Sequence, residues 1–423
     1  MPRPHPPAAP ALGAAALLLF LSLASPRPLP AQQVEVTDLG TLGGEASVAV
    51  AVNDLGEVVG QSLDARGRLR AFRWTRETGM VDLGTLGGRE SVAGAISETG
   101  LVVGQSLDGR GRLRAFLWTE EAGMRDLGGL GGNGSVARDV NRYGQVVGFG
   151  LTAGGEVHAF LWTEEEGMVD LGTLGGGSSV AVAVSETGQV IGRSLTAGGR
   201  LHAFLWTERD GMTDLGTLGG GRSVPRDVDD RGRVVGWSRT ADGEIHAFLR
   251  PPGEAMIDLG AAGGSGSFAV AVNNRGLVAG GRIAAPERVF GEGRLFMDRA
   301  RRRLAAPGAT SLRRDPRFGG LLRSGELTAF RWSDRGGIAD IGDLGGGGSV
   351  PRDVNDLGQV VGQSRTRSGE LHAFLWSEEE GMVDLGTLGG DRSAAADVNQ
   401  RGAVAGRSRT ADGRLRATLW ELR

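Results

Sequence analysis

Histidine and aspartate side chains, which could bind metal ions or move protons, recur at fixed positions of this sequence. Four histidines each begin the tripeptide His-Ala-Phe, and eight aspartates that recur at one position of a repeat each begin Asp-Leu-Gly or Asp-Ile-Gly. Imidazole and carboxylate groups are common ligands of zinc and calcium. The residues are His158, His202, His246 and His372, and Asp38, Asp82, Asp126, Asp170, Asp214, Asp258, Asp340 and Asp384.

We expect both sets to be structural. The histidine position holds Arg70, Arg114, Thr328 and Arg416 in the other segments, so it tolerates very different chemistry and is better explained as the end of an amphipathic strand. Catalysis needs one asymmetric site rather than eight equal ones. An aspartate in a turn accepts backbone N–H bonds, and this is the role that we predict for all eight.

Other motifs that could carry chemistry are incomplete. The Gly-rich runs, such as 345–348, lack the Lys and the following helix of a phosphate-binding loop. Segment 227–232 resembles part of a calcium loop but lacks its later oxygen ligands. The chain has no Cys, which excludes disulfides and Cys-based metal sites. A carboxylate pair of the glycosidase kind stays open because the chain holds 50 acids. We predict no catalytic residue, no metal and no cofactor.

Two groups of residues depart from the repeat and are the candidate ligand-binding residues. The first is a variable position at which Phe149, Arg193 and Trp237 occur in three consecutive segments. An aromatic–Arg–aromatic patch could stack on sugar rings or hold a peptide, although drift at a structural position is the alternative. The same position holds Gln61, Gln105, Gly281, Gln363 and Arg407 in the other segments.

The second group lies in an Arg-rich insertion at about 283–320. Clustered Arg attracts polyanions, so this segment could act as an anion-binding flap. The alternatives are a decayed ninth repeat and an artefact of GC-rich coding. The candidate residues are Arg299, Arg301, Arg302 and Arg303.

A 44-residue repeat positions all these residues. The Asp-Leu-Gly triplets are 44 residues apart, except that Asp258 and Asp340 are separated by 82, so the sixth repeat carries the insertion. Each repeat contains four segments of strand character, typified by 47–53, 57–62, 158–162 and 167–172. A period in this range with four strands is typical of propeller blades. The third strand carries Phe and Trp, which we expect to be core.

The ends of the array predict ring closure. It begins at Val34 inside a fourth strand and stops at Arg423, just after the third strand of the last repeat. The N-terminal strand can therefore complete the last blade and remove both sheet edges. We predict an all-β fold, an eight-bladed β-propeller of four-stranded blades closed in this way, with residues 34–423 as a single domain.

Residues 1–33 are predicted to be a signal peptide and short leader. An apolar stretch from Ala11 to Ala24 follows Arg3, and it is too short for a comfortable membrane span. The mature chain should therefore be secreted, extracellular or periplasmic, without a membrane span. An uncleaved N-terminal anchor is the alternative.

Charge is expected to differ between the two ends of the ring. In an up-and-down sheet successive connections lie at opposite ends of the strands. The loops after the second and fourth strands therefore lie at one end of the ring, and the loops after the first and third strands lie at the other. The loops after the second strand are rich in Arg, as at 66–68, and those after the third are rich in Glu, as at 164–166. This pattern predicts a basic end, which also bears the insertion, and an acidic end.

The repeat units resemble those of the HAF-repeat extracellular proteins. The matching segments begin with the His-Ala-Phe at His158, His202, His246 and His372, and the resemblance covers residues 34–281 and 325–423. The order of strands is also similar to that in kelch-type blades. The resemblance implies export and a repeat fold, and it implies no catalytic residues.

The leading hypothesis is a secreted, non-enzymatic β-propeller that acts as a binding or interaction module through its basic, Arg-rich face. The partner would be a glycan, a polyanion or another protein, with no specific nucleic acid, and the protein is expected to be a monomer. One alternative is an extracellular hydrolase or lyase acting on polysaccharide. It should show an acid, His or Tyr that departs from the repeat and faces the central channel. The other alternative is a surface protein that self-assembles head to tail.

Overall fold

The computed structural model describes Met1 and residues 33–261, 263–284 and 325–423. The described residues between Val34 and Arg423 form one compact unit. The predicted signal peptide, apart from Met1 and residue 33, lies outside the described residues, as do Arg299, Arg301, Arg302 and Arg303. All regular elements in the described part of the chain are strands. The fold is therefore all-β, as predicted.

The strands form units of four along the chain. Unit 1 consists of β2 (Gly43–Val52), β3 (Val58–Asp64), β4 (Leu69–Thr75) and β5 (Gly79–Asp82). Unit 2 consists of β6 (Gly87–Ile96), β7 (Val102–Asp108), β8 (Leu113–Thr119) and β9 (Gly123–Asp126). Unit 3 consists of β10 (Gly131–Val140), β11 (Val146–Thr152), β12 (Val157–Thr163) and β13 (Gly167–Asp170). Unit 4 consists of β14 (Gly175–Val184), β15 (Val190–Thr196), β16 (Leu201–Thr207) and β17 (Gly211–Asp214).

The remaining strands repeat this order. Unit 5 consists of β18 (Gly219–Val228), β19 (Val234–Thr240), β20 (Ile245–Arg250) and β21 (Ile257–Asp258). Unit 6 consists of β22 (Gly266–Val272), β23 (Val278–Ile283), β24 (Leu327–Ser333) and β25 (Gly337–Gly342). Unit 7 consists of β26 (Gly345–Val354), β27 (Val360–Thr366), β28 (Leu371–Ser377) and β29 (Gly381–Asp384). Unit 8 consists of β30 (Gly389–Val398), β31 (Val404–Thr410), β32 (Leu415–Leu422) and β1 (Val34–Asp38).

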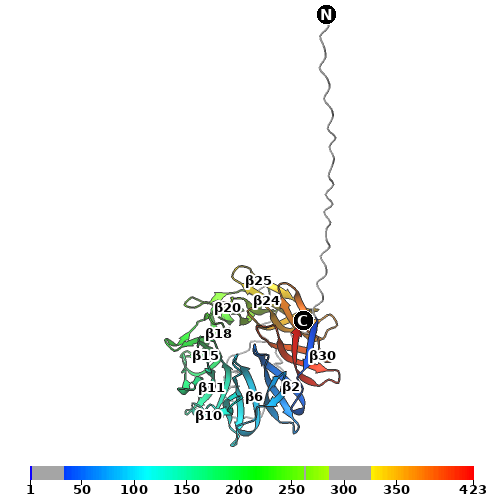
Figure 1. Cartoon of the computed structure of the whole chain (residues 1–423). Coiled ribbons are helices and arrows are strands. Elements are labelled where there is room, and N and C mark those ends of the chain that lie inside the picture. Colours follow the sequence, from blue (N-terminus) through cyan, green and yellow to red (C-terminus); the bar gives the residue numbers. More distant parts are fainter. Residues whose placement is uncertain (2–32, 262, 285–324) are drawn as a thin grey trace. The chain divides into compact units, whose positions relative to one another are not determined.

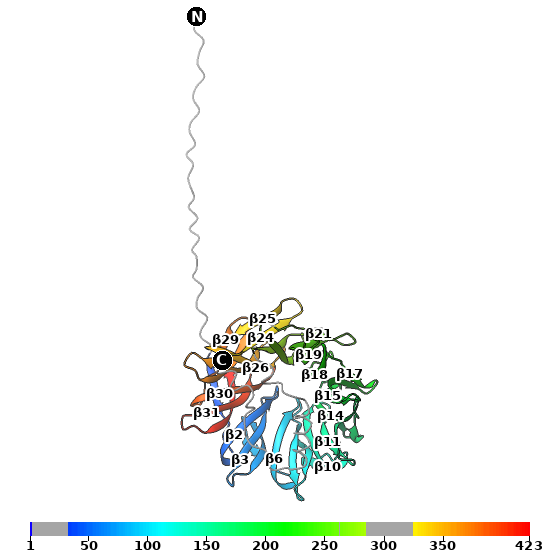
Figure 2. The same cartoon turned by 180° about the vertical axis from the view of Figure 1, so that it is seen from behind.

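The four-stranded units are arranged around a common centre, the architecture of a β-propeller (Figure 1). Within each unit the strands are antiparallel neighbours. Unit 8 takes its fourth strand from the other end of the array, because β1 pairs with β32 from Val34 opposite Leu422 to Asp38 opposite Thr418. Strands β30 and β2 lie near each other in both views (Figure 1 and Figure 2).

Side-chain size explains how neighbouring strands approach each other. A Cβ at Gly60 in β3 would lie 2.1 Å from the Val48 carbonyl oxygen and 2.9 Å from the Phe72 ring, so only glycine fits there. The Phe of the third strand occupies this space, and Phe72 and its equivalents Phe116, Phe160, Phe204 and Phe248 are fully buried. The prediction that the aromatic residues of the third strand form the core is confirmed for these Phe residues and for most of the Trp residues, whereas Trp206 and Trp332 are only partly buried.

Buried serines connect each unit to the next. Ser349 of β26 donates a hydrogen bond to the Gly342 carbonyl (2.7 Å), and its hydroxyl accepts one from Ala329 N in unit 6 (2.9 Å). The bond across the boundary between units 8 and 1 is equivalent, since Ala417 N donates to Ser47 Oγ at 2.9 Å. Every unit has such a serine in its first strand: Ser47, Ser91, Ser135, Ser179, Ser223, Ser267, Ser349 and Ser393.

Candidate functional site

The repeated aspartates cap turns. In each unit the carboxylate accepts a hydrogen bond from the backbone N–H two residues later, as in the 2.8 Å bond from Gly172 N to Asp170 Oδ1. The other seven bonds are donated by Gly40, Gly84, Gly128, Gly216, Gly260, Gly342 and Gly386. The structural role predicted for these residues is confirmed.

In most units, the side chain at the histidine position bonds to the repeated aspartate of its own unit. His158 Nδ1 lies 2.8 Å from Asp170 Oδ2, and Arg114 Nε lies 3.1 Å from Asp126 Oδ2. Both imidazole and guanidinium groups can donate to a carboxylate, which explains why the position accepts either residue. In unit 6 the position is Thr328, and Arg282 from the adjacent strand bonds to both Thr328 and Asp340.

Phe149 and Trp237 lie in the core, which corrects their prediction as ligand-stacking residues. Phe149 is fully buried and Trp237 is 3% exposed. Arg138 lies over the Phe149 ring at 5.4 Å, and Arg222 lies over the Trp237 ring at 4.8 Å. A ring covered in this way has no free face for a sugar or a peptide. Arg193, between them in the order of units, is partly exposed.

Packing between strands explains part of the variability at this position. The variable position lies on the second strand of each unit and pairs with a residue of the first strand. Val136 pairs with Phe149 in unit 3, and Val224 pairs with Trp237 in unit 5. In unit 6 the pair is Phe268 and Gly281, and a Cβ on Gly281 would lie 2.6 Å from the Phe268 ring. A large residue on one strand thus accompanies a small one on the other.

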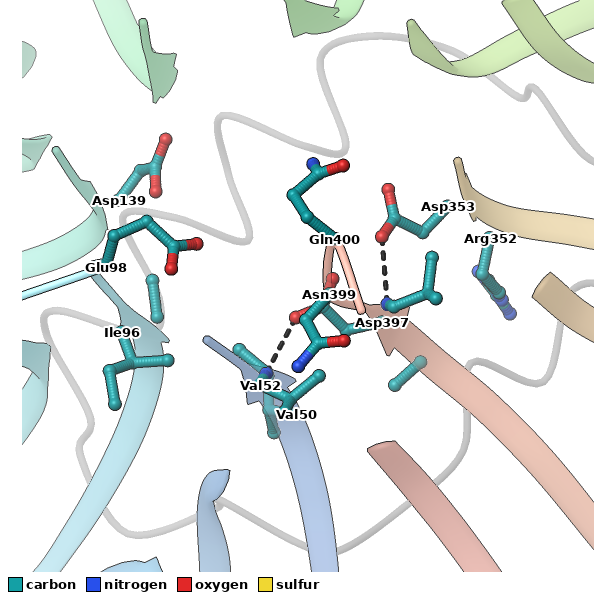
Figure 3. Close-up of a pocket in the computed structure, with 14 residues that line it drawn as sticks. Val50, Val52, Ile96, Glu98, Asp139, Arg352, Asp353, Asp397, Asn399 and Gln400 are labelled. Carbon is teal, nitrogen blue, oxygen red and sulfur yellow. Dashed lines mark hydrogen bonds between the residues drawn. The ribbon is translucent and has the colours of Figure 1, made fainter. Parts of the chain in front are cut away.

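A polar pocket of about 370 Å³ lies at the centre of the units (Figure 3). It is bordered by residues of units 1, 2, 3, 7 and 8. Glu98 and Asp139 lie on one side of it, and Asp353 and Asp397 lie on the other. Its other polar lining residues are Arg352, Asn399 and Gln400. We call this recess the acidic pocket.

The aspartates of the acidic pocket connect adjacent units. Asp139 Oδ2 accepts a hydrogen bond from Val184 N of unit 4 at 2.9 Å. Asp353 accepts one from Val398 N of unit 8, and Asp397 accepts one from Val52 N of unit 1. Asp227 occupies the same position in unit 5 and bonds to Val272 N of unit 6.

Burial changes the acidity of these groups. Loss of contact with water raises the pKa of Asp139 to about 6 and the pKa of Asp227 to about 7, although their backbone hydrogen bonds act in the opposite direction. Burial and the neighbouring Asp353 carboxyl, to which Asp397 is hydrogen-bonded, raise the pKa of Asp397 well above its usual range. The pKa of Glu98 is also raised, mainly by burial.

Our sequence analysis did not identify these aspartates as a group. The sequence does contain a pattern that could have identified them. The residue before the last Val or Ile of the first strand is Asp in four units and Ala in the other four. The aspartates are Asp139, Asp227, Asp353 and Asp397, and the alanines are Ala51, Ala95, Ala183 and Ala271. From the sequence, Asp227 was considered only as part of a calcium loop.

The described residues contain neither a metal-binding cluster nor a helix that could span a membrane. Their His, Asp and Glu side chains include no group of three or more that could hold a metal ion. No helix in this part of the chain has the length and apolar character that a membrane span needs.

Similarity to known proteins concerns the fold. No protein-family model matches the chain, and no curated protein matches it. Among solved structures, the β-propeller domain of the Trilobed protease from Pyrococcus furiosus is 10% identical, with a TM-score of 0.45, over 81% of this chain and 97% of that one. The BP39L lectin from Burkholderia pseudomallei is 8% identical, with a TM-score of 0.41, over 80% and 98%.

TolB from Acinetobacter baumannii is 15% identical, with a TM-score of 0.35, over 48% of this chain. This chain spans about half the length of that TolB structure, 51%. At such identities the likenesses bear on the fold alone.

Proposed function

We propose that this protein is a secreted, non-enzymatic β-propeller that serves as a binding or interaction module. The observation that carries the proposal is the asymmetry of the acidic pocket. Most positions of the units repeat, but three positions in the pocket wall vary. The position of Glu98 holds Glu, Asp, Arg, Asn or Gln, that of Asp139 holds Asp or Ala, and that of Arg352 holds Arg, Val, Gly or Ala. A rigid repeated frame with a few varied side chains facing one recess is how repeat proteins build recognition surfaces.

The proposal includes three finer statements. The chain is a member of the HAF-repeat extracellular family, which the repeated His-Ala-Phe segments support. Its ring has eight blades and is closed by the N-terminal strand, which the pairing of β1 with β32 supports. Export follows from the apolar segment 11–24. The basic, Arg-rich end remains a second candidate surface, and its insertion lies outside the described residues.

A ligand screen tests the proposal. The full-length protein would be applied to arrays of glycans, polyanions and secreted proteins, and we expect a saturable signal. Glu98→Gln and Arg352→Ala should weaken that signal, whereas Glu165→Gln on an exposed loop should not. Absence of any saturable ligand would contradict a binding role. If binding is the same in both pocket variants as in the wild type, the binding site would be assigned to the basic end instead of the acidic pocket.

The acids of the central pocket bear on a second candidate, an extracellular hydrolase acting on polysaccharide. Asp353 and Asp397 are hydrogen-bonded carboxyls that face the central pocket, as the enzyme alternative requires. Glycosidase carboxylates, however, are about 5–9.5 Å apart, too far to bond directly. The pair instead resembles carboxyls that share a proton. Release of reducing ends from a polysaccharide panel, lost in Asp397→Asn, would favour the enzyme over the binding module.

A further inference from the structure

A second, smaller pocket lies between units 1, 2 and 3. Its volume is about 220 Å³, below the range of about 300–1,000 Å³ that drug-sized ligands occupy. Val50, Val92 and Val136 supply apolar walls, and Gln61, Gln105 and Arg138 supply the side-chain polar groups. We call it the amide pocket.

The two glutamine side chains lack partners. Neither Gln61 nor Gln105 makes a side-chain hydrogen bond within the described part of the chain, and Gln105 is only 3% exposed. A carboxamide that is shielded from water normally satisfies both its donor and its acceptor within the protein, because an unmade hydrogen bond is destabilising. Gln363, at the same position of unit 7, follows this rule and donates to the Ser393 carbonyl at 2.7 Å. The amides of Gln61 and Gln105 are not among the buried side-chain atoms that lack a partner; they line the pocket, where a ligand can bond to them.

Gly94 opens the amide pocket. It is the only glycine at the bulge of the first strand, where other units have Val50, Arg138, Val182, Arg226, Val270, Arg352 and Ala396. A Cβ on Gly94 would meet its nearest atom, the Val103 carbonyl oxygen, at 3.7 Å, an ordinary contact. Its φ is not among the positive values that would require glycine. Neither crowding nor backbone conformation demands glycine, and the consequence of its presence is free volume.

We propose that the amide pocket binds one neutral sugar unit, either free or at the end of a glycan. Hydroxyl groups both donate and accept, which matches two carboxamides, and the Arg138 guanidinium donates to ring or hydroxyl oxygens. The three valines suit the C–H face of a sugar ring. Asp139 lies next to Arg138 in the chain and borders the adjoining acidic pocket, so the local charge does not favour an anionic sugar. This inference rests on the proposed binding function and specifies its ligand.

Titration of the full-length protein with D-glucose, D-galactose, D-mannose and their methyl glycosides tests the inference. We expect at least one to bind, and Gly94→Val, which introduces the side chain of units 1, 4 and 6, to weaken binding about tenfold or more. Gln105→Ala should also weaken it. Gln363→Ala is the matched control, because it removes an amide already bonded within the protein. A melting temperature close to that of the wild type would show that the variants fold, and Gly94→Ala provides a milder substitution.

The outcomes separate the two proposals. If the arrays yield a ligand but no neutral sugar binds, the sugar inference is wrong and the binding function stands. Sugar binding unchanged in Gly94→Val and Gln105→Ala would also overturn the inference, as would preference for D-glucuronate. If neither arrays nor sugars give a signal, both proposals fail. Binding of a methyl glycoside but not of the free sugar would support the proposed site and identify the ligand as a glycan end.

Discussion

Individual aspartates at the centre of the units combine two roles that normally conflict. Asp227 accepts hydrogen bonds from Val228 N at 2.9 Å and from Val272 N at 2.8 Å, and these bonds favour its charged form. Burial nevertheless dominates and raises its pKa to about 7. The residue therefore joins units 5 and 6 while keeping its proton at a pH where ordinary aspartates have lost theirs.

Asp227 should make stability fall as the pH rises. The unfolded aspartate loses its proton near pH 4, whereas the folded one holds it to about pH 7. Between these values the folded state binds more protons, so the free energy of unfolding decreases with increasing pH. The free energy of unfolding of the wild type should fall between about pH 4.5 and pH 7.5. We expect this decrease to be smaller by roughly 1–3 kcal/mol in Asp227→Asn, as measured by urea unfolding. Asp242→Asn, on an exposed turn, is the control, and an unchanged pH profile in Asp227→Asn would refute the argument.

The elements of neighbouring units are joined by buried hydroxyls as well as by apolar packing. Ser349 of unit 7 is completely buried and bonds to two backbone groups of unit 6, across the boundary between units 6 and 7. Ser349→Ala should lower the free energy of unfolding by about 1–3 kcal/mol, because it leaves the Ala329 N–H without its acceptor. Ser368→Ala, in an exposed turn, should change it by less than about 0.5 kcal/mol. Equal effects in chemical unfolding would show that the buried hydroxyl contributes little.

Two arginines at the same position of the third strand provide a matched comparison. Arg73 stacks on Trp118 and bonds to Glu57, which is 8% exposed. Arg331 stacks on Trp376 in the same way, but its acidic partner is the exposed Glu378.

Arg73→Leu should cost about 3 kcal/mol because it leaves the buried Glu57 carboxylate without its cation. Arg331→Leu should cost less than about 1 kcal/mol, since exposed ion pairs contribute little. Leu stands at this position in most other units, so both variants should fold. Thermal unfolding of the two proteins provides the test, and similar losses would contradict the role assigned to Glu57.

The sequence contains most of the information about these elements, because each strand type recurs eight times with its own pattern. The all-β class, the aromatic core and the capping role of Asp170 and its equivalents follow from that repetition. The effects of pairing across strands could not be predicted in this way. Phe149 and Trp237 looked exposed because they vary, and only the register shows Val136 and Val224 opposite them.

The pockets were harder to predict than the strands. Asp139 and Gly94 each occupy a position where a small or apolar residue is common, and a single unit gives no reason to select them. Whether these residues line a pocket depends on the side of the strand on which they lie and on the residues of the adjacent unit. A comparison of each strand position across all units, with attention to departures from the common residue, would have found both.

At the scale of the whole molecule, the boundary between units 8 and 1 has the same bonds as the boundaries within the array. The Asn399 side chain donates to the Asn53 carbonyl at 2.9 Å, just as Asn355 donates to the Asn399 carbonyl between units 7 and 8. Gln400 N donates to Asp54 Oδ1 at 2.7 Å. The proposed closure therefore rests on polar bonds as well as on the pairing of β1 with β32.

Loss of β1 should open the proposed ring. A variant lacking residues 2–38 would leave β32 as an unpaired edge strand and would remove Val34 and Val36 from their packing against the core of unit 8. We expect a lower melting temperature and self-association in size-exclusion chromatography, because exposed strand edges pair with other chains. Removal of residues 2–32 alone should have neither effect. Val36→Pro, which interrupts the ladder opposite Trp420 without shortening the chain, should reproduce part of the loss. A monomer of unchanged stability after removal of residues 2–38 would show that the ring does not depend on this strand, and the bonds of Asn399 and Gln400 would then be sufficient to hold units 8 and 1 together.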